Sequence, residues 1–212
     1  MGRFVTFEGL DGCGKTTQLA MLAKKLRLES PDWRVLETLN PGGTLLGKEL
    51  RQIILEQRQE SSPPSAMAEL FLYLADRAQH VHDVIIPALQ SKTVVLCDRF
   101  TDSTVAYQGF GRGLSNAMLG QLNSWASQAI VPDCTFLLDA PVELLLGRLK
   151  GPKDRLESES FSFFERVRHG YLDLARQYPE RIVVLDASQS AEVLSELIFS
   201  HLMTVLTPAQ EK

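Results

Sequence analysis

Hydrophobic positions along the chain follow two different spacings. Five short apolar runs, rich in β-branched and aromatic residues, have the character of buried strands, and helical spacing dominates between them. The runs cover residues 4–8, 33–38, 93–97, 134–139 and 181–186. Clear helical patterns cover residues 66–89, 141–149, 161–178 and 191–205. Strands that alternate with helices predict an α/β fold, with a five-stranded parallel sheet flanked by helices and right-handed crossovers.

Three polar segments interrupt the alternation. The Ser/Pro-rich residues 61–65 predict a break that restarts a long helix at Ala66. Residues 100–115 form a polar segment that leads to another helix, and residues 150–160 are charged and irregular. A chain of 212 residues suits one domain, residues 1–212, with an inserted lid at about 148–160.

Composition narrows the partners and the compartment. The formal net charge of −4 gives no global basic field, so the sequence predicts no general nucleic-acid partner. No apolar run reaches the 18 residues that a membrane helix needs. Cys13, Cys97 and Cys134 share no C-x-x-C spacing, and the histidines show no metal-site spacing with them. We therefore expect reduced thiols in a cytoplasmic protein, and no zinc.

The first strand runs into a glycine-rich turn and then into a helix. Gly9, Gly14, Lys15 and Thr16 fill every fixed place of the Walker A pattern G-x-x-x-x-G-K-[ST]. Such a loop points backbone N–H groups at phosphates, while the lysine reaches the β- and γ-phosphates and the hydroxyl faces Mg²⁺. The predicted ATP-binding stretch is Gly9, Leu10, Asp11, Gly12, Cys13, Gly14, Lys15, Thr16 and Thr17. The sequence thus predicts a P-loop NTPase fold, but the motif alone leaves ATPase, GTPase, kinase and passive nucleotide binder open.

Residues near the ends of later strands favour a kinase. Ligands of an open parallel sheet bind beyond the carboxyl ends of its strands. Asp98 ends an apolar run there, where a Walker B acid would hold Mg²⁺ together with Thr16, and Arg99 beside it can bridge phosphates. The basic cluster 147–155 can supply lid arginines to a γ-phosphate. The sequence has no N-K-x-D motif and no D-x-x-G motif outside the phosphate loop, as a GTPase switch would need, which leaves a kinase for a small acceptor.

Several motifs in order resemble thymidylate kinase along almost the whole chain. They are Phe7-Glu8-Gly9-Leu10-Asp11-Gly12-Cys13-Gly14-Lys15-Thr16-Thr17, Pro41-Gly42-Gly43-Thr44, Cys97-Asp98-Arg99, Ser103-Thr104-Val105-Ala106-Tyr107-Gln108-Gly109 and Asp154-Arg155-Leu156-Glu157 with Phe161 to Phe164. The resemblance implies transfer of the ATP γ-phosphate to dTMP with Mg²⁺, giving dTDP for dTTP synthesis. It also implies a homodimer of the bacterial type, in which the lid carries the catalytic arginine.

The resemblance assigns roles position by position. It implies that Arg77 binds thymine, with Tyr73 standing where a Phe usually stacks on the base. Thr104 and Gln108 would read the thymine edge, and Tyr107 would exclude a ribose 2′-hydroxyl. Arg51 and Arg99 would hold the acceptor phosphate, and Asp11 would lie near the sugar 3′-hydroxyl. The implied dTMP-binding set is Asp11, Pro41, Arg51, Tyr73, Arg77, Arg99, Thr104, Tyr107 and Gln108, and the catalytic set is Lys15, Arg99, Arg148 and Arg155.

Two alternatives and one departure accompany this prediction. A deoxynucleoside kinase would need a carboxylate base at the 5′-hydroxyl. A nucleotide-binding regulator would have lost catalysis. Leu39-Asn40 stands where the family commonly has Arg-Glu, so two charges are missing near the acceptor site. Which of Arg148 and Arg155 reaches the γ-phosphate is left open.

Overall fold

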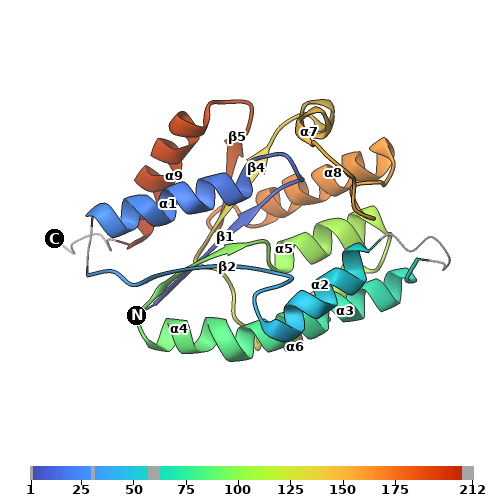
Figure 1. Ribbon diagram of the computed structural model, residues 1–212, viewed down its shortest axis with the longest axis horizontal. Helices are drawn as coiled ribbons and strands as arrows, with labels where there is room; N and C mark the ends of the chain where they lie inside the picture. The colour runs from blue at the N-terminus through green and yellow to red at the C-terminus, as the bar shows by residue number, and fades with distance from the viewer. Residues whose placement is uncertain (1, 30–31, 57–62, 207–212) are drawn as a thin grey trace.

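The computed structural model describes residues 2–29, 32–56 and 63–206. Its five strands form one parallel sheet in the order β2-β3-β1-β4-β5 (Figure 1). The strands are β1 (Arg3–Glu8), β2 (Val35–Leu39), β3 (Val94–Asp98), β4 (Cys134–Asp139) and β5 (Ile182–Asp186). The predicted sheet is therefore confirmed. Of the predicted break at 61–65, residues 61 and 62 lie outside the described residues.

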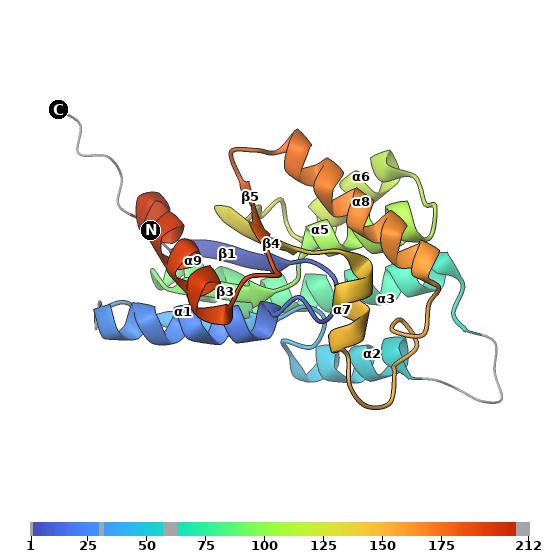
Figure 2. The ribbon, with the colours of Figure 1, turned by 90° about the horizontal axis from the view of Figure 1, so that it is seen from above.

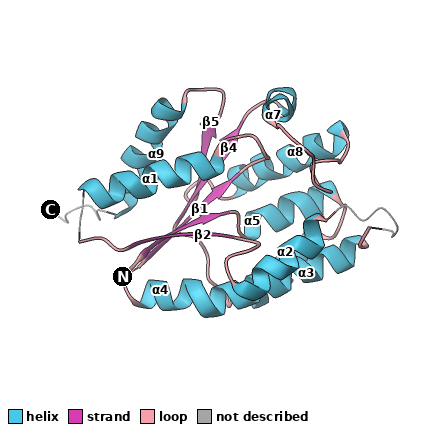
Figure 3. Cartoon of the chain, viewed as in Figure 1, coloured by secondary structure: helices cyan, strands magenta, loops and turns pink. Residues whose placement is uncertain are grey.

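Helices cover both faces of this sheet (Figures 1 and 3). They are α1 (Lys15–Glu29), α2 (Leu45–Leu55), α3 (Ala66–His80), η1 (Val81–Ile85), α4 (Ile86–Gln90), α5 (Thr101–Thr104), η2 (Val105–Gly111), α6 (Asn116–Ala126), α7 (Val142–Arg148), α8 (Phe161–Gln177) and α9 (Ala191–Leu206). Helices α1 and α9 lie side by side on one face, as both views show (Figures 1 and 2). Helices α3, α4 and α6 lie on the other. None of the helices in these ranges has the length and apolar character needed to cross a bilayer.

Alternation along β1 explains how the two faces are filled. Val5 and Phe7 are fully buried and belong to the cluster that contains Leu22 of α1, whereas Phe4 packs in a separate cluster with Val81 of η1. Successive side chains of a strand point to opposite faces, so one strand supplies both layers of the core. β1 is central in the sheet, and it therefore places the turn that follows it, residues 9–14, in the middle of the carboxyl edge.

The predicted long helix 66–89 is divided into three parts. The Ile86 N–H donates to the Val81 carbonyl five residues back, so the turn at η1 is a π-helix rather than an α-helix. Pro87 follows immediately and has no N–H to continue the α pattern. The helical face nevertheless continues, because Leu70, Leu74, Val81 and Ile85 are all buried.

Residues 100–115, which the sequence analysis identifies only as a polar segment, are largely helical. α5 and η2 cover residues 101–111, and η2 packs against α8. Glycine and β-branched residues give this stretch weak intrinsic helix propensity. Burial stabilises it instead: Ala106, Tyr107 and Gly111 are buried, and a side chain at Gly111 would lie 2.7 Å from the Phe163 ring. Tertiary packing therefore decides the conformation.

Candidate active site

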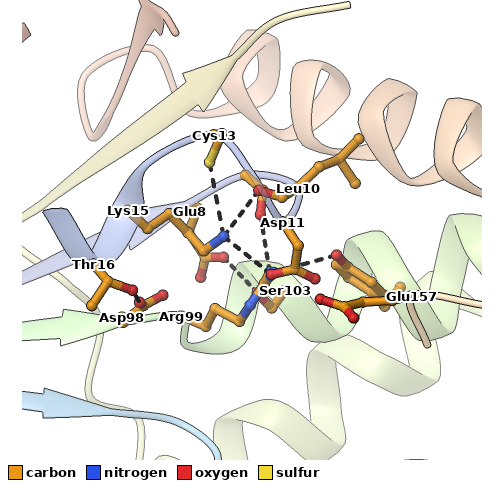
Figure 4. A network of polar contacts seen from close by, with 12 residues as sticks. Glu8, Leu10, Asp11, Cys13, Lys15, Thr16, Asp98, Arg99, Ser103 and Glu157 are labelled. Carbon is orange, nitrogen blue, oxygen red and sulfur yellow. Dashed lines mark hydrogen bonds and ion pairs between the residues drawn. The ribbon is translucent and has the colours of Figure 1, made fainter. Parts of the chain in front are cut away.

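The turn after β1 has the geometry of a phosphate loop. Gly9 has φ +133°, and a Cβ there would clash with the Leu138 carbonyl oxygen, so only glycine fits between β1 and β4. Lys15 begins α1 and is only 6% exposed; its Nζ donates to the Leu10 carbonyl at 3.0 Å and lies 3.5 Å from Asp11 Oδ1 (Figure 4). The lysine thus curls back over the loop, where a bound phosphate chain would lie.

Thr16 and Asp98 form the second feature of the loop. The Thr16 hydroxyl donates to Asp98 Oδ2 at 2.7 Å, which joins the start of α1 to the end of β3 (Figure 4). Within the described ranges no group of three or more His, Cys, Asp or Glu side chains could hold a metal. Mg²⁺ in nucleotide sites needs only one or two protein oxygens, because phosphates and waters complete its shell. This hydroxyl and carboxylate therefore fit Mg²⁺.

Arg99 follows β3 with φ 68°, a left-handed conformation that few non-glycine residues adopt. Its guanidinium donates hydrogen bonds to several groups of the site. Nη2 donates to Asp11 Oδ1 at 2.6 Å, and Nη1 donates to the Gly9 carbonyl at 3.0 Å and to the Tyr171 hydroxyl at 3.1 Å. Burial alone would raise the pKa of Asp11, but Arg99 and Lys15 outweigh it and hold that pKa far below its usual range. Asp11 is thus an anion that orients two cations.

Glu8, which the sequence interpretation left out of the site, supports this arrangement. Its carboxylate is 1% exposed and accepts hydrogen bonds from the Phe100 N–H at 2.7 Å, from Ser103 Oγ at 2.6 Å and from Tyr171 Oη at 3.0 Å. Burial and the nearby charge of Asp102 raise the pKa of Glu8. Its place at the carboxyl end of β1 was the one available signal. No local sequence pattern identifies Tyr171 as a site residue, because it lies on α8, far along the chain from β1.

Two pockets meet at Asp11, Arg51 and Arg99, which line both. One is lined by the phosphate loop and Arg148, together with Asp98 and residues of α1 and β2. The other extends away from it along α3 and η2, and the predicted residues Pro41, Tyr73, Arg77, Thr104, Tyr107 and Gln108 all line it. Asp154, Leu156 and Glu157, from the segment predicted as a lid, also line it, although the predicted dTMP-binding set omitted them. The shared wall thus carries two arginines and one carboxylate.

Arg77 lies at the inner end of the second pocket and is 1% exposed. Its guanidinium donates to four neutral acceptors: Thr104 Oγ1 at 2.8 Å, Asn123 Oδ1 at 2.6 Å, Asn40 Oδ1 at 2.9 Å and the Phe100 carbonyl at 3.0 Å. Burial lowers the pKa of Arg77 to about 10, so it stays charged at neutral pH. Its Nε has no partner among the described residues. A buried donor of this kind needs an acceptor from a ligand or water.

Four more of the predicted residues line this pocket, namely Arg51, Tyr73, Tyr107 and Gln108. The Tyr107 hydroxyl lies 3.4 Å from Arg99 Nη2, and Arg51 Nη1 donates to the Pro41 carbonyl at 3.0 Å. Burial raises the pKa of the Tyr73 hydroxyl, which therefore stays protonated. The Gln108 amide, predicted to read a base, donates to Glu69 at 2.9 Å. Gln108 thus lines the pocket, but its amide nitrogen is already hydrogen-bonded to Glu69.

The two lid arginines point to different parts of the site. Arg148, the last residue of α7, lies beside the phosphate loop: its Nη1 is 3.5 Å from the Gly12 carbonyl and 2.9 Å from that of Ala187. Arg155 instead donates through Nε to the Ile54 carbonyl at 2.8 Å and through Nη2 to Glu69 at 2.5 Å. The structure therefore brings Arg148, and not Arg155, to the phosphate loop.

Comparisons with known proteins agree with this geometry. A family model described as "Thymidylate kinase" matches residues 7–198. The chain is 46% identical to a curated thymidylate kinase of Trichlorobacter lovleyi over 94% of this chain and 98% of that protein. It is also 46% identical to one of Gloeobacter violaceus, over 99% and 98% of the two chains. The solved structure of thymidylate kinase from Ehrlichia chaffeensis superposes with a TM-score of 0.78 at 33% identity, over 96% of this chain and all of that one.

Proposed function

The chain belongs to the thymidylate kinase family, and we propose from its geometry which residues bind and align its two substrates. The protein phosphorylates dTMP to dTDP with ATP. The observation that carries the assignment is the shared wall of Asp11, Arg51 and Arg99 between the two pockets. Two phosphates must approach one another in line for direct transfer. The loop-side pocket therefore takes ATP, and the pocket along α3 takes dTMP.

The acceptor pocket holds dTMP with its base toward Arg77 and its phosphate toward the shared wall. The unpartnered Nε of Arg77 supplies a charged donor for a base carbonyl. Tyr73 offers an aromatic face from the same helix, one turn away. Tyr107 is 5% exposed and packed edge-on against Tyr171, which supports its role against a ribose 2′-hydroxyl. Arg51 and Arg99 then lie where the acceptor phosphate must be.

Transfer depends on positioning and charge. The acceptor is already an anion, so no strong general base is needed, and catalysis reduces to alignment and neutralisation. Lys15 serves the β- and γ-phosphates, and Arg148 adds a second cation at the loop. Asp11 keeps Arg99 in place through the bond at 2.6 Å. Mg²⁺, held through Thr16 and Asp98, would offset charge on the phosphate chain.

We also propose that the protein is a homodimer that uses α3 as the centre of its interface. The outward face of α3 presents Ala68, Phe71, Ala75 and Ala78, all exposed and at helical spacing. Phe71 is 54% exposed, and Trp125 on the adjacent helix α6 is 76% exposed. Apolar aromatics on neighbouring helices favour a protein partner. A second copy of this chain can cover this face with its own copy of the same face, as in a dimer with two-fold symmetry.

Arg51 gives the direct test of where the acceptor phosphate lies. In Arg51→Gln, kcat/KM for dTMP should fall by at least about tenfold, as expected for loss of a charge-assisted hydrogen bond. Arg34→Gln is the matched control, because Arg34 is exposed at the opposite end of the sheet. Equal kcat/KM values in Arg51→Gln and the parent protein would contradict the placement.

A further inference from the structure

Glu69 on the first turn of α3 is a buried carboxylate that binds side chains from two other parts of the chain, the end of η2 and residue 155. It is 1% exposed, and it accepts from Gln108 Nε2 at 2.9 Å, from Arg112 Nε and Nη2 at 3.2 Å each, and from Arg155 Nη2 at 2.5 Å. Burial alone would raise the pKa of Glu69. Hydrogen bonds from Arg112 and Gln108 and the charges of both arginines outweigh it, so the pKa is lowered and the carboxylate stays ionised.

Arg155 ties one end of the lid segment to this carboxylate. Its backbone N–H donates to the Leu55 carbonyl at 3.1 Å and its Nε to the Ile54 carbonyl at 2.8 Å, at the last turn of α2. Its side chain is 12% exposed. Within the described residues, the hydrogen bonds of this side chain therefore all go to α2 and α3. Leu156 and Glu157, which follow it, line the acceptor pocket.

Arg112 ties the other end of the segment to the same carboxylate. Besides Glu69 it donates to Glu159 Oε1 at 2.5 Å, and its guanidinium lies 4.8 Å from the centre of the Phe163 ring at the start of α8. Residues 154–159 are thus held at both ends through one anion. Removing that anion would take from Arg155 the carboxylate that it pairs with and leave Arg112 with Glu159 alone, which is costly for the closed arrangement because both guanidinium groups are partly buried.

We propose that Glu69 is a positioning residue that latches residues 154–159 over the acceptor pocket, and that Arg155 is its lid-side partner rather than a γ-phosphate ligand. The proposal rests on the proposed function for the meaning of the pocket. Gln108 lines that pocket and donates to the same carboxylate, so the latch also fixes one wall against which the acceptor packs. Loss of the latch should weaken acceptor binding and leave the ATP side largely unaffected.

Glu69→Gln tests the latch, because it keeps the size of the side chain and removes its charge. We expect KM for dTMP to rise about tenfold, which corresponds to a fall of the closed population to about a tenth. KM for ATP should change by less than about twofold. Amide hydrogen exchange of residues 154–159 should accelerate, and Glu69→Asp should recover part of both effects. Glu180→Gln is the control, since Glu180 is exposed just before β5.

A double-mutant cycle separates a latch from general damage to the fold. Arg155→Gln should raise KM for dTMP as Glu69→Gln does. The KM of the double variant should not exceed the higher of the two single-variant KM values, because both substitutions remove the same interaction. Additive losses would overturn the proposal, as would unchanged KM for dTMP and unchanged exchange in folded Glu69→Gln. A parent protein without dTMP-dependent turnover would contradict the proposed function instead, and the exchange comparison would still decide whether the latch exists.

Discussion

Replacing Lys15 by methionine removes the cation that the phosphate loop itself contributes. Lys15 is the one lysine or arginine in residues 9–17. Its stem is buried, and its Nζ is 3.0 Å from the Leu10 carbonyl. Methionine has a similar length, so the stem contacts are kept. The fold should therefore survive while the charge is lost.

The size of the effect follows from the distances involved. Two unit charges about 4 Å apart at an effective dielectric constant near 20 interact by about 4 kcal/mol. If about 3–4 kcal/mol of that acts only in the transition state, kcat falls about 10²- to 10³-fold. The stability cost is smaller, because the Leu10 carbonyl loses one hydrogen bond worth about 1 kcal/mol. Asp11 keeps Arg99 at 2.6 Å as its partner. In a chain of this size the loss should lower Tm by about 2–4 °C.

The assay follows dTDP formation directly at saturating ATP, dTMP and Mg²⁺, with Tm measured on the same samples. Lys24→Met is the control, because Lys24 lies exposed on the same helix. A folded Lys15→Met protein with kcat within about threefold of the parent protein would refute the charge argument. A much larger fall of Tm in that variant would refute the claim that the contacts of the side-chain stem are enough to keep the protein folded.

Three further outcomes test other parts of the structure. Tyr107→Phe, which removes only the hydroxyl 3.4 Å from Arg99, should raise the kcat/KM of the ribonucleotide relative to dTMP by about tenfold, measured by competition between the two acceptors. Phe71→Glu should shift the sedimentation coefficient to that of a monomer, while Phe161→Glu, also exposed but on α8, should not. His80 is buried beside Arg77, and both burial and that charge lower its pKa to about 4. It therefore stays neutral in the folded protein while the unfolded chain takes up a proton near pH 6.5, so stability should fall by about 2 kcal/mol from pH 7 to pH 5, and His80→Asn should lose that part of the slope in urea unfolding.

The sheet could be predicted because its strands carry strong local signals. The run at 93–97 is apolar throughout, as a strand buried on both faces must be, and the structure places it between β1 and β2. Residues 101–111 carried no such signal. Their helix exists because Tyr107 and Gly111 pack against α8, which lies more than fifty residues further along the chain. A contact of that kind leaves no local periodicity to detect.

In the site, too, some residues could be predicted from local sequence and others could not. The phosphate loop, Thr16 and Asp98 were predicted from motif spacing, because their geometry is set by one strand-turn-helix unit and its neighbouring strand. The support for Arg99 could not be predicted. It comes from Glu8 and Tyr171, which are 163 positions apart and meet at 3.0 Å. Likewise, no spacing rule separates the roles of Arg148 and Arg155, since only the fold sends one to Gly12 and the other to Glu69.

Asn40 shows how one departure from the family pattern changes the charge balance of the acceptor pocket. Its amide accepts from Arg77 Nη2 at 2.9 Å through Oδ1 and donates to Asp76 Oδ2 at 2.5 Å through Nδ2. A glutamate here would pair with Arg77, but it would also meet the Asp76 carboxylate, whose pKa burial already raises. An amide has a donor for one neighbour and an acceptor for the other. Because all four described acceptors of Arg77 are neutral, none of its hydrogen bonds among the described residues goes to a carboxylate, and its charge is not neutralised by a direct ion pair there.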